Sequence, residues 1–246
     1  MRRNVHAGMT LIEVLIAVSL LSVLSLGMLF AMRVGMNALD KANRKLLDNR
    51  RVAGAGRIIV QQLAGFMPVI AVAATAPDAP GFKVPFFEGR ARSMRLVSTY
   101  SLQQAARGIP QVLEFQVIPG EQGRGVRLVV NENPYTGPRS AGVFCLGPGP
   151  DPEAGMTTQR FTPIVVGSGS FVLADRLASC QFLYLEPGPA PGLEKWTPNW
   201  VLPRWPIAIR IEMASLDDDR SKLKPLTVTS ALRVNRYPIF DYGDFE

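Results

Sequence analysis

The stretch Ala7-Gly8-Met9-Thr10-Leu11-Ile12-Glu13-Val14-Leu15-Ile16-Ala17 lies between a short basic leader and a long apolar run. The 19 residues from Val14 to Met32 carry no charged side chain, which is the length expected of a membrane-spanning helix. A helix from Met9 to Met32 has 24 residues and would be about 36 Å long, enough to cross a hydrocarbon core of about 30 Å with some tilt. We therefore expect this stretch to anchor the chain in a membrane.

Glu13 is a charged residue within four positions of the start of this apolar segment. A carboxylate at the centre of a membrane helix costs about 2.5–3.5 kcal/mol, so its position needs an explanation. One interpretation is that Glu13 reaches the lipid headgroups, because it lies near one end of the run. The other requires a cut between Gly8 and Met9, after which the new amine of Met9 would pair with Glu13 of the same or an adjacent subunit. In a bundle of such helices, that pair would fix the axial register.

The segment Gly8–Ala17 resembles the class III prepilin signal, which type IV pilins share with the pseudopilins of type II secretion. The resemblance implies that a prepilin peptidase cleaves after Gly8 and methylates the new amino terminus at Met9. It also implies that Glu13, the fifth residue of the mature chain, guides assembly into a filament. Met9 departs from the usual pattern, in which phenylalanine stands at this position. The implied topology is a single span of the inner membrane, with a cytoplasmic amino terminus and a periplasmic carboxyl-terminal domain.

Composition argues against several other functions. The net charge of +7 falls to +5 when the leader is removed with Arg2 and Arg3. The sequence has no Lys/Arg tract interleaved with aromatic residues, so it does not indicate nucleic-acid binding. The only histidine is His6 in the leader, so the mature chain would contain no histidine base and no histidine metal ligand. The tract 217–219 has three aspartates but lacks the alternate spacing of a calcium loop, and a solvated turn explains it better. We expect no metal, no cofactor and no catalytic residue.

Two cysteines, Cys145 and Cys180, are too few and too far apart in sequence for a zinc site. In a periplasmic domain they would be free to form a disulfide, which would stabilise the fold by roughly 4 kcal/mol according to the chain-entropy model. The alternative is a pair of unpaired, buried thiols. We expect the disulfide.

The chain divides into four segments: a leader (1–8), a transmembrane half-helix (9–32), an amphipathic half-helix (33–67) and a β-rich domain (68–246). Pro68 would end the helix, and a soluble domain would pack on its apolar stripe. Residues 71–92 and 132–160 are rich in proline and glycine and are expected to be loops. Strands are expected at Met94–Thr99, Val112–Ile118, Val126–Asn131, Phe161–Val166, Cys180–Leu185, Ile207–Met213 and Leu226–Val234. A long helix followed by antiparallel strands is an α+β arrangement, and it matches the pilin-like fold that the resemblance implies.

The carboxyl-terminal third is similar to that of the J-type minor pseudopilins of type II secretion. The similarity lies in Phe182-Leu183-Tyr184, Trp196, Trp200 and Leu202-Pro203, and in the earlier segment Phe87-Glu88-Gly89. It implies a tip complex with I-type and K-type minor pseudopilins and the major pseudopilin, which primes assembly and supports the export of folded proteins. Core packing best explains Trp196, Trp200 and Trp205, although tryptophans in a proline-rich segment can also anchor a partner, either another pseudopilin or an exported protein.

Two other functions remain open. The first is a minor pilin of a type IV pilus or of a DNA-uptake system, since the first 60 residues would suit these equally well. The second is a membrane-anchored periplasmic enzyme, for which Glu186 and Glu194 would be the only plausible carboxylate pair.

Overall fold

The computed structural model describes residues 10–74, 81–152, 155–190, 192–216 and 226–233. The chain forms two compact units, residues 1–49 and 50–246, and the division falls within the long helix α1 (Leu11–Ala64). The helix ends before Gly65, four residues ahead of the expected stop near Pro68, and a short strand begins at Phe66.

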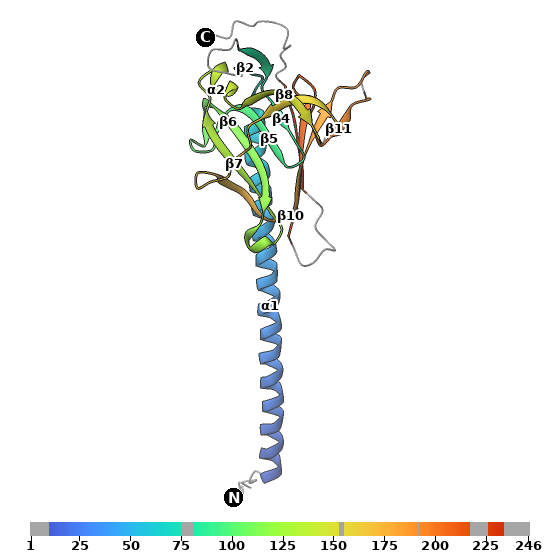
Figure 1. Cartoon of the computed structure of the whole chain (residues 1–246). Helices are drawn as coiled ribbons and strands as arrows, with labels where there is room; N and C mark the ends of the chain where they lie inside the picture. Colours follow the sequence, from blue (N-terminus) through green and yellow to red (C-terminus); the bar gives the residue numbers. More distant parts are fainter. Residues whose placement is uncertain (1–9, 75–80, 153–154, 191, 217–225, 234–246) are drawn as a thin grey trace, which may run out of the picture. The chain divides into compact units, whose positions relative to one another are not determined.

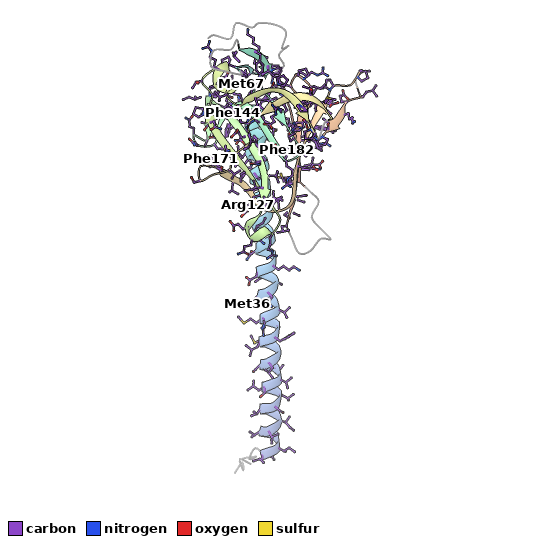
Figure 2. The ribbon with its side chains drawn as sticks, viewed as in Figure 1. Met36, Met67, Arg127, Phe144, Phe171 and Phe182 are labelled. Carbon is purple, nitrogen blue, oxygen red and sulfur yellow. The ribbon has the colours of Figure 1, made fainter. Side chains whose placement is uncertain are left out.

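In the first unit, apolar side chains project from α1 on all sides (Figure 2). Leucine, isoleucine, valine, methionine and phenylalanine from Leu11 to Leu39 are mostly more than half exposed. A helix that is apolar all round suits a lipid environment or the interior of a helical bundle. Val34, Ala38 and Ala42, which are part of the predicted apolar stripe, belong to this first unit and are exposed within it.

The second unit is built on a nine-stranded antiparallel sheet with the order β1-β5-β6-β7-β10-β12-β13, to which β4 and β11 add as side branches on β5 and β10 (Figure 1). Two smaller hairpins, β2-β3 and β8-β9, complete the domain. The strands are β1 (Phe66–Met67), β2 (Ile70–Ala73), β3 (Phe82–Pro85), β4 (Glu88–Gly89), β5 (Ser93–Ser101), β6 (Ala106–Pro119), β7 (Val126–Pro134), β8 (Cys145–Asp151), β9 (Met156–Phe161), β10 (Phe171–Glu186), β11 (Lys195–Thr197), β12 (Ala208–Ser215) and β13 (Leu226–Ala231). Two short helices, η1 (Glu121–Gly123) and α2 (Pro138–Gly142), lie in the connections.

The main core lies on the sheet face that the last turns of α1 cover. Ala55, Ile59 and Leu63 from the helix are buried there with Leu96 and Phe115 from the sheet. This part of the helix therefore confirms the predicted packing of its apolar stripe. Because side chains alternate along a strand, Leu96 faces the helix while its neighbour Val97 faces the other side of the sheet.

A second core covers that other side. Val97 and Val112 from the sheet pack there with Phe86, Ala141 and Cys145, which lie near the β2-β3 hairpin, in α2 and in β8. The close approach of α2 to β2 requires glycine at position 142, because a Cβ on Gly142 would overlap the carbonyl oxygen of Val72.

The structure confirms the α+β fold and six of the seven expected strands, but it corrects three regions. Residues 71–92 and 132–160 are not loops throughout: they contain β3, β4, α2, β8 and most of β2 and β9. The strand expected at Phe161–Val166 is absent, because β9 ends at Phe161 and no ladder continues through residues 162–166. Prolines are tolerated in β8 because this strand pairs on one edge only, with β9, so a missing N–H can face away from its partner.

Candidate functional site

The amino-terminal end of α1 is held by Thr10 and Glu13. The Glu13 N–H donates to Thr10 Oγ1 at 3.4 Å, and the Thr10 N–H donates to Glu13 Oε2 at 3.5 Å. This reciprocal arrangement is a capping box, in which two side chains satisfy backbone donors that the first helical turn leaves free. It holds the Glu13 carboxylate at the positive end of the helix dipole, where a negative charge is stabilised. Sequence reasoning missed this cap, although the pattern Thr-x-x-Glu ahead of an apolar run is its usual signal.

The helix that follows is long and apolar enough to cross a membrane. The candidate span is Leu11–Asn43, 33 residues with a mean hydropathy of 2.5 in its most apolar window. Two of its hydroxyl groups are satisfied within the helix: Ser19 Oγ donates to the carbonyl of Ile16 at 2.9 Å, and Ser22 Oγ donates to the carbonyl of Val18 at 2.8 Å. Such internal bonds lower the cost of placing a hydroxyl in hydrocarbon.

The predicted cleavage site at Gly8 and the predicted methylation site at Met9 lie outside the described residues. The register role of Glu13 concerns an assembly, and the structure contains one chain. These three assignments therefore remain predictions, as does the solvated turn at 217–219, which also falls outside the described residues.

Comparison with known families gives a match at the amino-terminal end of the chain. Residues 3–29 match the family model described as the prokaryotic N-terminal methylation motif. A search of the curated proteins found no match. The motif indicates a type IV pilin-like or pseudopilin protein, a class of structural subunits, and it implies processing by a prepilin peptidase and assembly with other pilin-like subunits. Together with the apolar helix at Leu11–Asn43, it suggests a membrane anchor.

The three tryptophans have different environments, and two of them are part of the core. Trp200 and Trp205 are each only 6% exposed and belong to the main core, and a partner contact at the tryptophans stays a prediction. Trp196 is half-buried beside β10, and the guanidinium of Arg210 covers its ring at 4.1 Å from the ring centre. Core packing, the simpler of the two interpretations offered by the sequence, accounts for Trp200 and Trp205.

The expected disulfide is not present: Cys145 and Cys180 are both free, buried thiols. Cys180 belongs to the core beneath α1 and Cys145 to the core on the opposite side of the sheet. The sheet therefore separates them, and two sulfur atoms on opposite faces of a strand layer cannot be bridged. Burial raises the pKa of each thiol to about 12, so neither is a reactive thiolate at neutral pH.

Sequence reasoning also missed a buried charge cluster centred on Arg95. The side chain of Arg95 is fully buried and donates to Glu88 Oε2 at 2.6 Å, to Glu114 Oε1 at 2.7 and 2.9 Å, and to the carbonyl of Thr162 at 2.8 Å. Its guanidinium also lies 5.2 Å from the ring centre of Phe144. The cluster joins β4, β5 and β6 to the segment after β9. The sequence signal for this cluster is a single cation, Arg95, among the apolar residues of β5. Its carboxylate partners Glu88 and Glu114 are 7 and 19 positions away, so the sequence does not show that they meet it.

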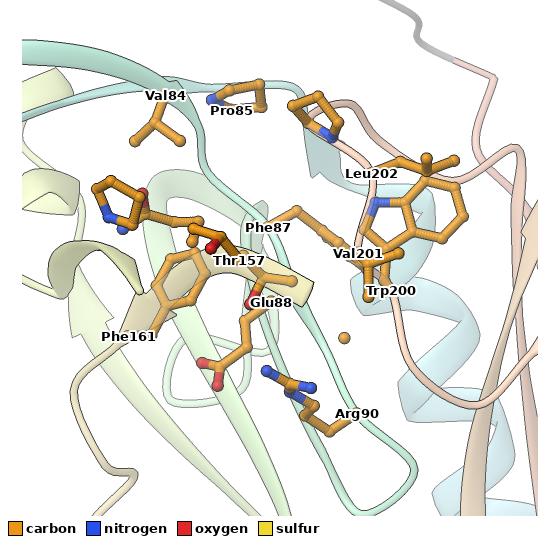
Figure 3. Close-up of a pocket in the computed structure, with 15 residues that line it drawn as sticks. Val84, Pro85, Phe87, Glu88, Arg90, Thr157, Phe161, Trp200, Val201 and Leu202 are labelled. Atoms are coloured by element: carbon orange, nitrogen blue, oxygen red, sulfur yellow. The ribbon is translucent and has the colours of Figure 1, made fainter. Parts of the chain in front are cut away.

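Beside this cluster lies a cavity of about 270 Å³, lined by residues from β3, β4, the β8-β9 hairpin and the segment 200–203 (Figure 3). Figure 3 shows Phe161 on one side and Trp200 on the other, with the Glu88 carboxylate and the Arg90 guanidinium directed toward one another between them. Gly89 passes close to the aromatic core, since a Cβ there would lie 2.7 Å from Tyr184 Cζ and 2.9 Å from Trp200 Cβ. Only glycine allows β4 to present Glu88 at this depth.

Proposed function

We propose that this chain is a minor pseudopilin of the J type, a subunit of the tip complex of a type II secretion pseudopilus. In this role it would be anchored in the inner membrane by a single span, with its amino terminus in the cytoplasm and its β-rich domain in the periplasm. The observation that carries the proposal is the methylation motif at residues 3–29, which leads directly into an exposed apolar helix and an antiparallel domain.

The assignment to the J type draws support from an aromatic cluster. The residues that carry the sequence resemblance lie far apart in the chain but pack together: the ring centres of Phe87 and Tyr184 are 5.6 Å apart, and Trp200 lies 6.4 Å from Phe87 and 6.5 Å from Tyr184. All three contacts have edge-to-face geometry, which is favourable between aromatic rings. A motif whose members share one structural role is a more specific signal than the same residues scattered over a surface.

Processing and assembly follow from the same motif. We propose that the prepilin peptidase cleaves between Gly8 and Met9 and methylates Met9, and that Glu13 then pairs with a mature amino terminus in the assembly. The partners would be I-type and K-type minor pseudopilins and the major pseudopilin, and the assembly would support the export of folded proteins. The favoured alternative is a minor pilin of a type IV pilus or a DNA-uptake system, which the same motif would serve.

Affinity purification of the full-length, tagged chain from its native membranes tests the choice between these roles. Recovery of I-type or K-type pseudopilins supports the secretion role, whereas recovery of pilus or DNA-uptake subunits replaces it with the alternative. Mass spectrometry of the purified chain tests processing independently. A mature chain that begins at Met9 with one added methyl group is expected, and a Gly8→Leu variant should retain its leader. An unprocessed wild-type chain in the presence of active peptidase would overturn the processing step.

A further inference from the structure

The strand β13 forms one end of the nine-stranded sheet. It pairs on one side with β12, from Ala208↔Ala231 to Met213↔Leu226, and no strand in the described part of the chain pairs with its other side. The backbone of an edge strand presents N–H and C=O groups that suit another extended backbone. This edge of the sheet is therefore a candidate site for an added strand.

The register shows which residues of β13 face the open side. The N–H of Leu232 donates to the carbonyl of Ile207 at 2.8 Å, and this pair continues the register of β12 and β13. In an antiparallel pair of strands, hydrogen-bonded positions alternate with positions whose backbone groups point outward. Thr227, Thr229 and Ala231 are the outward positions, so each directs an N–H and a carbonyl away from β12. Their side chains are also exposed.

This edge lacks the usual protection against strand addition. Exposed edges in natural sheets commonly carry charged residues or prolines. Among the hairpin strands, β3 carries Lys83 and Pro85, and β8 carries Pro148 and Pro150. By contrast, residues 226–232 contain neither a charged residue nor a proline. An uncharged edge of this kind, rich in β-branched residues, favours pairing with another strand.

An apolar flank of α1 lies beside the same edge. A Cβ on Gly56 would lie 3.0 Å from Val228 Cγ2 and 3.2 Å from Leu226 Cδ2, so α1 contacts β13 at this turn. Val60 follows one turn later on the same side of the helix, and it is 40% exposed. A strand added to β13 would direct alternate side chains toward this flank. The added strand should therefore be apolar at those positions.

We propose that β13 binds an extended, uncharged segment of a different pilin-like subunit, which adds to the sheet as a further strand. The backbone of this segment would bond with Thr227, Thr229 and Ala231, and its apolar side chains would cover Val60. The inference rests on the assembly with other pilin-like subunits that the methylation motif implies, and not on the J-type assignment.

A second copy of this chain fits the edge less well. Two β13 strands pair antiparallel about a two-fold axis normal to the sheet, and that axis would reverse the direction of α1 in one copy. Subunits that are anchored in one membrane by the same helix share one direction. Two parallel β13 strands related by a two-fold axis along the strands would turn the apolar face of the second copy away, so that its threonines faced Val60.

Hydrogen exchange tests the proposal directly, because an added strand protects alternate amides. In the full-length chain purified alone in detergent micelles, the amides of Thr227, Thr229 and Ala231 should exchange fast, whereas those of Val228 and Ser230 should be protected by β12. In the complex isolated from native membranes, exchange of the three outward amides should slow at least tenfold. Outward amides that stay fast in the complex overturn the proposal. Outward amides already protected in the lone chain also overturn it, since the chain's own residues would then cover the edge.

Photo-crosslinking in native membranes identifies the bound segment. Benzoylphenylalanine in place of Ala231 should form a product with a different pilin-like subunit. The same replacement at Ser179, an exposed position of β10 away from the edge, should not. A product with a second copy alone, or equal products from both positions, overturns the proposal. A pilus subunit in the product would replace the J-type role and still support the added strand.

A matched pair of variants, each carrying the crosslinker at position 231, separates the backbone of β13 from its side chains. Thr229→Pro removes an outward N–H without breaking a bond to β12, and it should reduce the crosslinked product at least tenfold. Thr229→Ala removes the same side chain but keeps the N–H, and it should retain the product. Equal amounts of product from the two variants overturn the proposal. Should Thr229→Pro fail to fold, Thr227→Lys replaces it, because a charge on an exposed edge opposes strand addition, and full recovery of the product would then overturn the proposal.

Discussion

The surroundings of a buried side chain in this protein depend on which side of the sheet it faces. Arg95 and its neighbours Met94 and Leu96 are all fully buried on β5, yet Arg95 lies among carboxylates while the two apolar residues pack beneath α1. The alternation of the strand explains the apolar pair. It does not explain Arg95, whose burial is tolerated because Glu88, Glu114 and the Thr162 carbonyl together occupy its donors.

We expect Arg95→Ala to lower the free energy of unfolding by about 3–5 kcal/mol, because removing one member of a buried ion cluster leaves its partners uncompensated. Chemical denaturation would measure the loss. The matched control is Arg127→Ala, which breaks the exposed pair with Glu121 at 3.1 Å and should cost less than about 1 kcal/mol. Equal losses in the two variants would show that the Arg95 cluster contributes no more than a surface pair.

The raised pKa of Glu88 predicts a pH dependence with a defined sign. A carboxyl group that binds its proton more tightly in the folded state than in the unfolded state stabilises the fold at low pH. That contribution is lost as the pH rises from the unfolded value near 4.5 through the raised folded value. Over this window the unfolding free energy of the wild type should fall relative to that of Glu88→Gln. A difference between the two proteins that grows in favour of the wild type as pH rises would contradict the direction of the shift.

Glu13 should affect assembly and not the fold of the β-rich unit. We expect Glu13→Ala to leave the denaturation curve of that unit unchanged, because Glu13 lies in the other unit, and to abolish incorporation into the filament. Crosslinking in membranes would measure incorporation. Glu13→Gln is the informative companion, since it retains an oxygen acceptor near Thr10 but loses the charge. Normal assembly of Glu13→Ala would disprove the register role.

At the scale of elements, regular hydrophobic patterns were predictable and irregular ones were not. The apolar run of α1 and the alternation in β6 and β12 follow directly from side-chain periodicity. The strand β8 was missed because Cys-Leu-Gly-Pro-Gly-Pro-Asp is typical of a loop, and its strand geometry depends on pairing with β9. Long-range strand pairing of this kind cannot be predicted from the local sequence. The contact of Arg95 with Glu88 and Glu114 cannot be predicted from it either.

The contact between α2 and β2 gives an element-scale prediction. Gly142→Ala should lower the free energy of unfolding by about 1–3 kcal/mol, because the added methyl group overlaps the Val72 carbonyl and forces the two elements apart. Gly167→Ala is the control, since no atom lies within 4 Å of its Cβ position. Thermal denaturation of both variants would measure the effect. A Gly142→Ala protein as stable as the control would mean that α2 can shift without cost.

At the scale of the whole molecule, the two free cysteines give a direct chemical test. A chain purified from an oxidising compartment should have the mass of two free cysteines. Its thiols should resist an aromatic disulfide reagent in the native state, because both are buried and both have a pKa raised to about 12. Denatured protein should release two equivalents. A mass lower by two hydrogens would restore the bridge and require a rearranged sheet.

The placement of these two cysteines on opposite sides of the sheet also has a consequence in time. Before the sheet forms, the two sulfur atoms are free to meet, and oxidation at that stage would create a bond that the finished sheet cannot accommodate. After the sheet forms, the same two atoms are kept apart for the life of the fold. The redox state of a recovered molecule would thus record which came first, folding or exposure to an oxidant: molecules with two free thiols folded before an oxidant reached them, and bridged molecules were oxidised before their sheet formed.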